Sequence, residues 1–305
     1  MFFMRLVVFL LCLITAAGAQ EFKGGTTQVR VDVLVTNEKG IVTGLKAEDF
    51  VFTDEGREVK LNYFGKDDTT LNVLLLVDVS GSMQKFLEQI SRRSNELLAK
   101  LRDTDKVGVM GFSKETDFLM PFTSNKGRAG NAVQQAMRPG FLPAGTAINA
   151  ALVDAAQAFI ESPGLKGHRA IFILTDNKCL NYRVSDEAVM RKLFAADAVL
   201  NSIVTRAAEP PRPVRDPEQR NPDFSFADVF KLSAESGGEV LRTDRADEAL
   251  SRLLDNLRAR YLVTYDAPPS SPDQFRRIQV SLTKEAQKRY GKLTIRARAG
   301  YYTGS

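Results

Sequence analysis

The sequence predicts an α/β protein in which a doubly wound, mostly parallel sheet is inserted between two terminal β segments. Continuous apolar runs such as Val73–Val77 alternate with helical patterns through the middle of the chain, which is typical of parallel sheets covered on both faces. Patterns of alternating strands precede residue 68 and follow residue 258. Neither terminal segment has enough strands for a stable sandwich alone, so we expect the two to pair into a small β-sandwich-like domain.

The composition is that of an ordinary globular protein. The 305 residues are 44% hydrophobic and 26% charged, which excludes a disordered chain, a collagen and a multispan membrane protein. His168 is the only histidine, so a multi-histidine zinc or iron site is excluded, and a Ser-His-Asp enzyme would have to use it.

Residues 1–19 have the pattern of a cleavable secretory signal. Arg5 supplies the positive charge, Leu6 to Ala16 form an uncharged apolar stretch, and small residues at 17–19 predict cleavage after Ala19. The stretch is shorter than the about 20 residues that span a bilayer, and an uncleaved anchor is the alternative. We therefore expect a secreted or periplasmic protein without a membrane span after cleavage, in which Cys179 is the only remaining thiol.

The N-terminal β segment, residues 20–68, opens with a strand in which the valines from Val29 to Val35 alternate with Arg30, Asp32, Leu34 and Thr36. The residues at 37–40 are typical of a turn. One helical turn is expected at 47–50, and a second strand pair surrounds 54–56 and ends near Phe64.

The middle segment, residues 70–257, alternates strands with helices, as parallel sheets require. A stretch at 207–222 interrupts the series with five prolines; it predicts an extended surface loop, for which a plain connector is favoured over a recognition element. Strands are expected at 71–77, 106–112, 116–122, 171–174, 199–205 and 239–242, and helices at 84–101, 127–137, 146–161, 185–196, 225–236 and 246–258.

The C-terminal β segment, residues 258–305, returns to alternating strands and carries ten Lys or Arg against three Asp or Glu. Arg277 and Gln279 alternate with apolar neighbours, as do Arg296 and Arg298. This pattern favours the solvated faces of half-buried strands over a surface for nucleic acid or an anionic polymer. We expect no nucleic-acid partner.

Three short loops carry the side chains that predict a metal site. Two of them directly follow expected parallel strands, at the edge where open α/β sheets bind ligands. All of the side chains are hard oxygen donors, which suit Mg²⁺ or Mn²⁺, with Ca²⁺ as a further option, rather than zinc. The candidate ligands are Asp78, Ser80 and Ser82 in the first loop, Thr146 after Gly145, and Asp176 after Thr175.

This set resembles the metal-ion-dependent adhesion site of von Willebrand factor type A (VWA) domains. An Asp-x-Ser-x-Ser loop, a distant threonine in a Gly-Thr turn and a distant Thr-Asp match in order, spacing and strand context over residues 71–257. The resemblance implies a Rossmann-like VWA fold for this segment. One departure is Asn177, where the family usually has glycine; asparagine tolerates a left-handed backbone better than most residues.

The resemblance also implies a role for each ligand. Ser80 and Ser82 would bind the metal directly, Thr146 directly or through water, and Asp78 and Asp176 mainly through bound waters. Neutral hydroxyls leave the cation under-neutralised, so it would favour an Asp or Glu carboxylate from a partner protein.

The flanking segments carry a second resemblance, to secreted bacterial VWFA-related proteins. It rests on residues 42–45, 48–50 and 54–56 near the start and on 275–278 and 296–302 near the end. It adds an expected architecture rather than a function.

The expected function is therefore a protein-binding adhesion or scaffold module and not an enzyme. The sequence offers no obvious general base, second metal cluster or nucleotide loop. His168 is expected at the opposite end of its strand from Asp176, and Cys179 is expected to pack rather than react. The alternatives are a scaffold that makes its contacts through the β segments, a metal-assisted hydrolase, and a site without metal in which Ser80 and Ser82 cap a helix.

Overall fold

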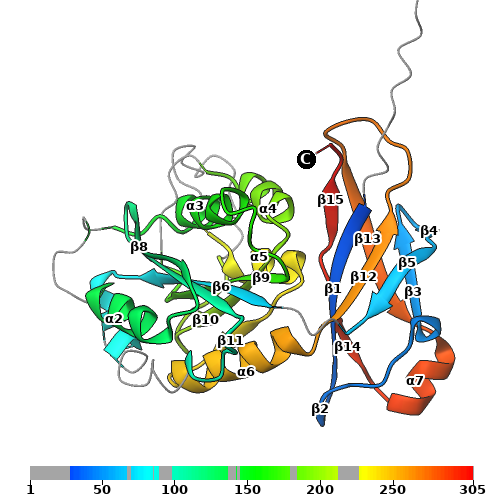
Figure 1. Cartoon of the computed structure of the whole chain (residues 1–305), viewed down its shortest axis with the longest axis horizontal. Helices are drawn as coiled ribbons and strands as arrows, with labels where there is room; N and C mark the ends of the chain where they lie inside the picture. Colours follow the sequence, from blue (N-terminus) through cyan, green and yellow to red (C-terminus); the bar gives the residue numbers. More distant parts are fainter. Residues whose placement is uncertain are drawn as a thin grey trace, which may run out of the picture.

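The computed structural model describes residues 28–66, 70–84, 86–88, 98–136, 142, 145–178, 184–211 and 227–304. Its sheets form two units that lie side by side (Figure 1). We call residues 71–258 the α/β unit, and residues 28–65 with 261–304 the β unit. The chain leaves the β unit after residue 65 and returns to it at residue 261, so the α/β unit is an insertion. The expected signal at 1–19 lies outside the described residues.

The α/β unit is built on a six-stranded sheet with the order β11-β10-β9-β6-β7-β8. All neighbouring strands are parallel except β8, which runs antiparallel to β7. The apolar run of β6 lies at the centre and is buried along its whole length, which confirms the mostly parallel sheet. The strands are β6 (Leu71–Asp78), β7 (Lys106–Phe112), β8 (Thr116–Thr123), β9 (His168–Thr175), β10 (Ala198–Val204) and β11 (Val240–Arg242).

Helices cover both faces of this sheet, which confirms the doubly wound arrangement. α2 and α6 contribute to the hydrophobic core on one face, and α3, α4 and α5 contribute to the core on the other. Most of the helix expected at 84–101, and residues 212–222 of the expected loop, lie outside the described residues. The helices are α2 (Lys126–Ala136), α3 (Ile148–Ile160), α4 (Asp186–Ala195), α5 (Val229–Ser236) and α6 (Ala246–Arg258).

The β unit consists of two antiparallel sheets that share one core. N-terminal strands pair with C-terminal ones as expected, β1 with β12 and β3 with β13. The alternating valines of β1 face this core. The first sheet contains β1 (Gln28–Asn37), β2 (Gly40–Ile41), β5 (Leu61–Gly65), β12 (Tyr261–Asp266) and β14 (Thr294–Arg296); the second contains β3 (Phe50–Asp54), β4 (Arg57–Glu58), β13 (Phe275–Leu282) and β15 (Gly300–Tyr302).

Two short helical elements complete the β unit. The expected turn at 47–50 is a 3-10 helix, Ala47–Asp49. The helix α7 (Lys284–Tyr290) was not predicted, although Thr283 accepts a capping hydrogen bond from the Ala286 N–H and is followed by good helix formers. Its sequence signal was therefore present and was masked by the strand pattern on either side.

A buried carboxylate ties the strands of the β unit together. Asp54 is fully buried at the end of β3 and accepts hydrogen bonds from Tyr265 Oη at 3.0 Å and Tyr301 Oη at 2.8 Å. Arg276 Nε donates to its other oxygen at 2.7 Å. Burial, together with the hydrogen bond to Asp54, raises the pKa of Tyr301 to about 12. One side chain thus joins N-terminal β3 to three C-terminal strands.

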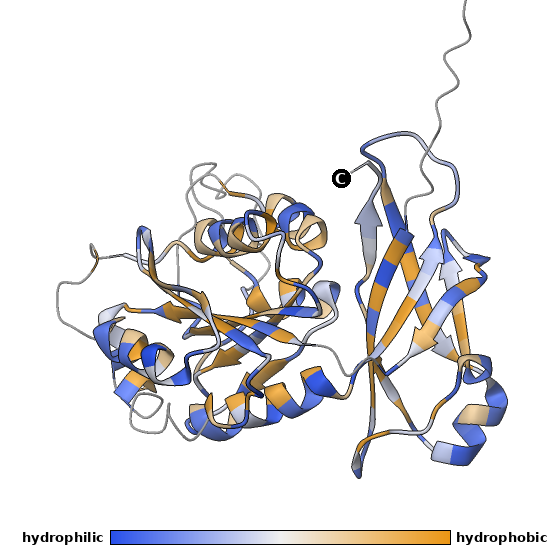
Figure 2. Cartoon of the chain, viewed as in Figure 1, coloured by the Kyte–Doolittle hydropathy of each residue, from blue (hydrophilic) through white to orange (hydrophobic). Residues whose placement is uncertain are grey.

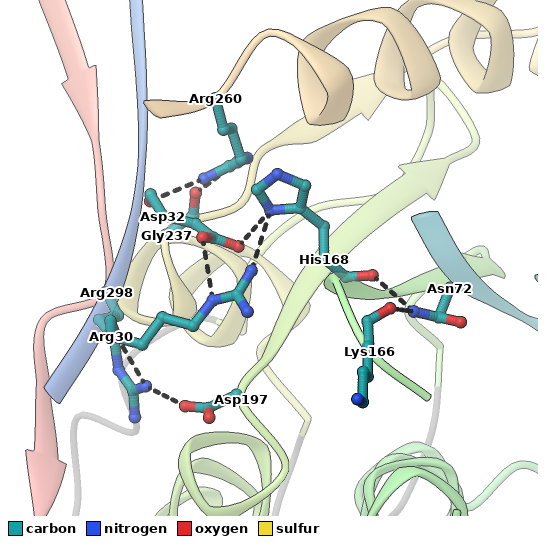
Figure 3. A network of polar contacts seen from close by, with 9 residues as sticks. All are labelled: Arg30, Asp32, Asn72, Lys166, His168, Asp197, Gly237, Arg260 and Arg298. Carbon is teal, nitrogen blue, oxygen red and sulfur yellow. Dashed lines mark hydrogen bonds and ion pairs between the residues drawn. The ribbon is translucent and has the colours of Figure 1, made fainter. Parts of the chain in front are cut away.

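The two units meet at the end of the sheet where the parallel strands begin. Asp32 of β1 contacts His168, the first residue of β9, and Arg260 donates to the carbonyl oxygens of Asp32 at 3.2 Å and Gly237 at 2.8 Å (Figure 3). β9 is eight residues long, so its far end lies about 25 Å away at the usual rise per residue of a strand. The β unit therefore leaves the opposite end of the sheet uncovered.

A second group of contacts holds the same interface. Arg298 donates to Asp197 at 2.7 Å (Figure 3) and to the Phe194 carbonyl at 3.2 Å. The rings of Phe194 and Phe275 stack with centroids 6.1 Å apart.

Among the described residues, no helix is both long enough and apolar enough to cross a membrane.

Candidate metal site

The first candidate loop begins where β6 ends. Asp78 is the last residue of the strand, and Ser80 precedes a single 3-10 turn, Gly81–Met83. The Ser80 side chain makes no capping hydrogen bond to this turn. Its Oγ instead lies 3.2 Å from the Oγ of Ser82. The capping alternative is therefore wrong for Ser80, whose hydroxyl is paired with that of Ser82.

Asp78 lies fully buried beneath these hydroxyls. Its Oδ1 accepts from the Ser80 N–H at 3.0 Å, and its Oδ2 accepts from Thr175 Oγ1 at 2.8 Å. Burial is the main cause that raises the pKa of Asp78 to about 6; the negative charge of Asp176 also raises it, and the hydrogen bonds from Ser80 and Thr175 oppose the shift. A nearby cation would stabilise the carboxylate at this position.

Thr146 reaches the same edge through a chain of backbone contacts. The Val79 N–H donates to the Phe112 carbonyl at 2.9 Å, and the Ala147 N–H donates to the carbonyl of the next residue, Ser113, at 2.7 Å. Helix α3 begins at Ile148 rather than at 146 as expected, so Thr146 lies in the loop before it. Gly145 has φ +129°, and a Cβ there would lie 3.2 Å from Lys114 Cβ, so this turn favours glycine.

Asp176 directly follows β9 and is 5% exposed. Its Oδ1 accepts from the Lys178 N–H at 3.0 Å. The next residue, Asn177, has φ 59°, the left-handed conformation expected for the residue that replaces the family's glycine. Its N–H donates to Thr175 Oγ1 at 3.1 Å, and its Nδ2 donates to the Glu209 carbonyl at 2.9 Å. The loop is therefore tied both to the strand end and to the segment after β10.

Thr175 is the site residue that the sequence analysis missed. It is fully buried, donates to Asp78 and accepts from Asn177. Val77 of β6 pairs with Leu174 of β9, so Thr175 lies beside Asp78 on the neighbouring strand. The sequence shows that Thr175 precedes Asp176. Its contact with Asp78 depends on β6 and β9 being neighbours in the sheet, which the sequence alone does not show.

In the candidate site the carboxylates are more deeply buried than the hydroxyls. Asp78 and Asp176 are buried, Ser80 and Thr146 are half-buried, and Ser82 is exposed. In the described part of the chain, no three His, Cys, Asp or Glu side chains gather closely enough to hold a metal by themselves. A cation at this edge would therefore depend on hydroxyl oxygens.

The spacing of the serine hydroxyls fits such a cation. Adjacent oxygens of an octahedral Mg²⁺ shell are about 3 Å apart, close to the 3.2 Å between Ser80 Oγ and Ser82 Oγ. Lys178 Nζ lies 3.9 Å from Asp176 Oδ2 and its side chain is 74% exposed. This ammonium can leave the carboxylate when a metal arrives, because its own side chain is exposed and can be solvated by water instead.

His168 lies at the start of β9, at the opposite end from Asp176, as expected. Cys179 lies outside the described residues.

Comparison with known families identifies the domain that carries the site. Residues 73–178 match the model of the von Willebrand factor type A domain. The chain contains a VWA domain. The matched segment runs from β6 to just beyond Asp176 and includes all three loops. VWA domains are a general protein-interaction fold and often bind a metal at a site of this type. No curated protein matches the chain.

Several solved structures are similar to the chain. An aerotolerance-related membrane protein from Bacteroides fragilis has 23% identity and a TM-score of 0.48, over 61% of this chain and 98% of that one. The conserved hypothetical protein BatB from Bacteroides thetaiotaomicron has 22% identity and a TM-score of 0.45 over the same shares. Proximal thread matrix protein 1 from the mussel byssus, with a zinc-occupied MIDAS motif, has 18% identity and a TM-score of 0.45, over 63% of this chain and 48% of that one.

Proposed function

We propose that the protein is a secreted or periplasmic, non-enzymatic binding module whose VWA domain presents a divalent cation to an Asp or Glu carboxylate of a partner protein. The observation that carries this proposal is the pair of hydroxyls of Ser80 and Ser82, 3.2 Å apart above the buried carboxylate of Asp78. Exposed neutral oxygens over buried negative charge are suited to a hard cation that keeps one coordination position open.

The residues divide into two groups by depth. Ser80, Ser82 and Thr146 would hold the cation through their hydroxyls, while Asp78 and Asp176 would act mainly through water and supply negative charge. The bound cation would supply positive charge for a carboxylate. Mg²⁺ or Mn²⁺ is favoured, and Ca²⁺ remains an option for a less compact shell.

The site residues do not support a hydrolase as well as they support binding. Asp78 already accepts from Ser80 and Thr175, so its oxygens are engaged in holding the loop. His168 lies at the far end of β9. We therefore propose capture of a partner rather than turnover.

Calorimetric titration of residues 20–305 with Mg²⁺ and Mn²⁺ tests the proposal. The double variant Ser80→Ala/Ser82→Ala removes both hydroxyls and leaves the buried carboxylates in place. We expect it to lose binding, while Ser124→Ala, an exposed serine near the far end of β8, binds as the unmodified protein does. Equal binding by the double variant would contradict the ligand assignment.

A second candidate function is a scaffold that makes its contacts through the β unit. The observation that favours it is a large cleft bounded by β1, β2 and β14 on one side. The two functions are compatible, because the cleft and the metal site lie at different places on the molecule.

A further inference from the structure

A cleft of about 830 Å³ opens where the two units diverge. One wall is the hairpin of residues 36–41 with β14, and the other is helix α6 with Glu239. Figure 1 labels β2, β14 and α6. Its volume falls within the range of roughly 300–1,000 Å³ that is usual for binding sites, which often lie between domains. Figure 2 shows both hydrophilic and hydrophobic residues along α6, and its leucines are buried in the core. No residue of the metal site and none of those drawn in Figure 3 lines the cleft.

The α6 wall of the cleft is acidic. Asp247 and Glu248, which are neighbours in the sequence, and Asp255, about two turns further along the helix, line it together with Glu239. The Glu239 side chain is only 4% exposed, and Asn256 Nδ2 donates to it. A carboxylate this deeply placed needs a positive charge nearby.

That positive charge comes from Arg260, a buried side chain whose charge acts on Glu239, and from exposed side chains. Arg252 lies 3.5 Å from the Glu239 carboxylate and is 63% exposed, and Lys100 lies 3.5 Å from Asp255 and is 45% exposed. The pair of Lys100 with Asp255 is exposed on both sides and contributes little stability, because solvent screens it. A basic side chain of a ligand can therefore replace Lys100 at small cost, and it can replace Arg252 while the charge of Arg260 still acts on Glu239.

The opposite wall offers an open strand edge. In the described chain β14 pairs only with β1, and Thr294 and Arg296 of β14 line the cleft. The Val42 N–H donates to the Val35 carbonyl, so the backbone groups of Val35 face β2. The N–H and C=O of one residue in an antiparallel strand point to the same side of the strand. Val35 directs both groups towards β2, so it makes no backbone hydrogen bond to Ile295, its partner on β14. The N–H and C=O of Ile295 consequently point away from β1.

We propose that this cleft binds an extended, basic segment of a partner protein. The segment adds as a strand to the edge of β14, and its Lys or Arg side chains on one face contact Glu239 and the acidic side of α6. Main-chain hydrogen bonds supply affinity in this recognition mode, and the facing side chains supply specificity. The interaction requires no metal, so it stands or fails independently of the function proposed above.

The test uses a fluorescent nonapeptide in which arginine and threonine alternate, so that all arginines share one face of a strand. We expect it to bind the full chain by fluorescence polarisation, equally well in excess EDTA and with Ser80→Ala/Ser82→Ala. Glu248→Gln/Asp255→Asn changes two exposed cleft carboxylates and should weaken binding about five-fold, as expected for two surface ion pairs. Glu58→Gln/Glu161→Gln, a matched change of exposed residues outside the cleft, should have no effect.

Two further peptides test strand addition to β14 and recognition of basic side chains separately. The same sequence N-methylated at alternate residues on its hydrogen-bonding edge should fail to bind, and a glutamate and threonine peptide should fail as well. Equal binding of the N-methylated peptide would overturn strand addition. Preference for the glutamate peptide, no binding of the arginine peptide, or equal weakening by both double variants would overturn the proposal as a whole.

Discussion

Asp32 Oδ2 lies 2.8 Å from His168 Nδ1, and both side chains are almost completely buried, at 8% and 1% exposure. The contact joins β1 of the β unit to the first residue of β9 in the VWA domain (Figure 3). Burial opposes ionisation of Asp32, yet the charges of His168, Arg30 and Arg260 outweigh it and hold the pKa of Asp32 well below its usual range. The interface between the units therefore depends on a buried negative charge.

Acid should remove the stability that this interface contributes to the fold. A carboxylate whose pKa is lowered by folding adds stability above its unfolded pKa of about 4 and loses it as the pH falls towards the folded value. We expect the free energy of unfolding to fall between about pH 4 and pH 2, and less steeply in Asp32→Asn. Urea unfolding across this range is the measurement. An identical acid dependence in Asp32→Asn, with exposed Asp117→Asn as control, would contradict the assignment.

Removal of the histidine should be costly. His168→Ala leaves Asp32 buried with only arginine partners, and loss of one partner of a buried pair typically costs about 3–5 kcal/mol. We expect a value near the lower end, because Arg30 Nε still lies 3.5 Å from Asp32. Denaturant unfolding at pH 7 measures the loss. A change below about 0.5 kcal/mol, the size of an ordinary surface substitution, would show that the pair is not a main contact.

Thr175 should position the metal site without being a ligand. Thr175→Val keeps the shape of the side chain and removes the donor to Asp78 and the acceptor for Asn177. Loss of such a supporting contact typically lowers metal affinity about 10–100-fold. Calorimetry with Mn²⁺ should detect this decrease, and Thr175→Ser, which retains the hydroxyl, should restore binding. Failure of serine to restore it would indicate a packing role alone.

Asn177 should tolerate glycine and reject branched residues. Its φ of 59° costs a side chain about 1–2 kcal/mol in general, and β-branched residues suffer most. Asn177→Gly should keep metal binding and lose only the contact with the Glu209 carbonyl. Asn177→Val should lower both thermal stability and Mn²⁺ affinity. Equal melting temperatures for the two variants would argue against backbone strain in this loop.

The expected division into 20–68, 70–257 and 258–305 also leads to a test. Residues 70–258 expressed alone would expose the side of His168 that faces Asp32. We expect this fragment to unfold at a lower temperature than residues 20–305, by differential scanning calorimetry. A fragment as stable as the whole would mean that the β unit contributes no support to the VWA domain.

The fold was predictable wherever a local pattern decides the structure. The periodicity of α6 gave its bounds, 246–258, and the apolar run at β6 marked the central strand. The metal loops were predictable because the spacing of Asp78, Ser80 and Ser82 is itself local. α7 was missed because a helix of seven residues has too few turns for its periodicity to stand out against neighbouring strands.

The remaining features depend on contacts between distant residues. Asp32 and His168 are separated by 136 positions, and no pattern in a single sequence indicates that they are in contact. Thr175 became a site residue only when strand order placed it beside Asp78. The cleft likewise exists because the two units diverge, and no property of α6 or β14 alone predicts it.

The attachment of the β unit to the starting ends of the parallel strands has a mechanical consequence. Asp176 follows the last residue of β9, and His168 at its first residue is held by Asp32. Tension applied to a partner at the metal site would run along β9 and β6 and pass through the interface into β1. Hydrogen bonds between β9 and β6 would be loaded in shear along their whole length instead of opening one at a time. The weakest point under load would then be the polar contacts between the units rather than the sheet.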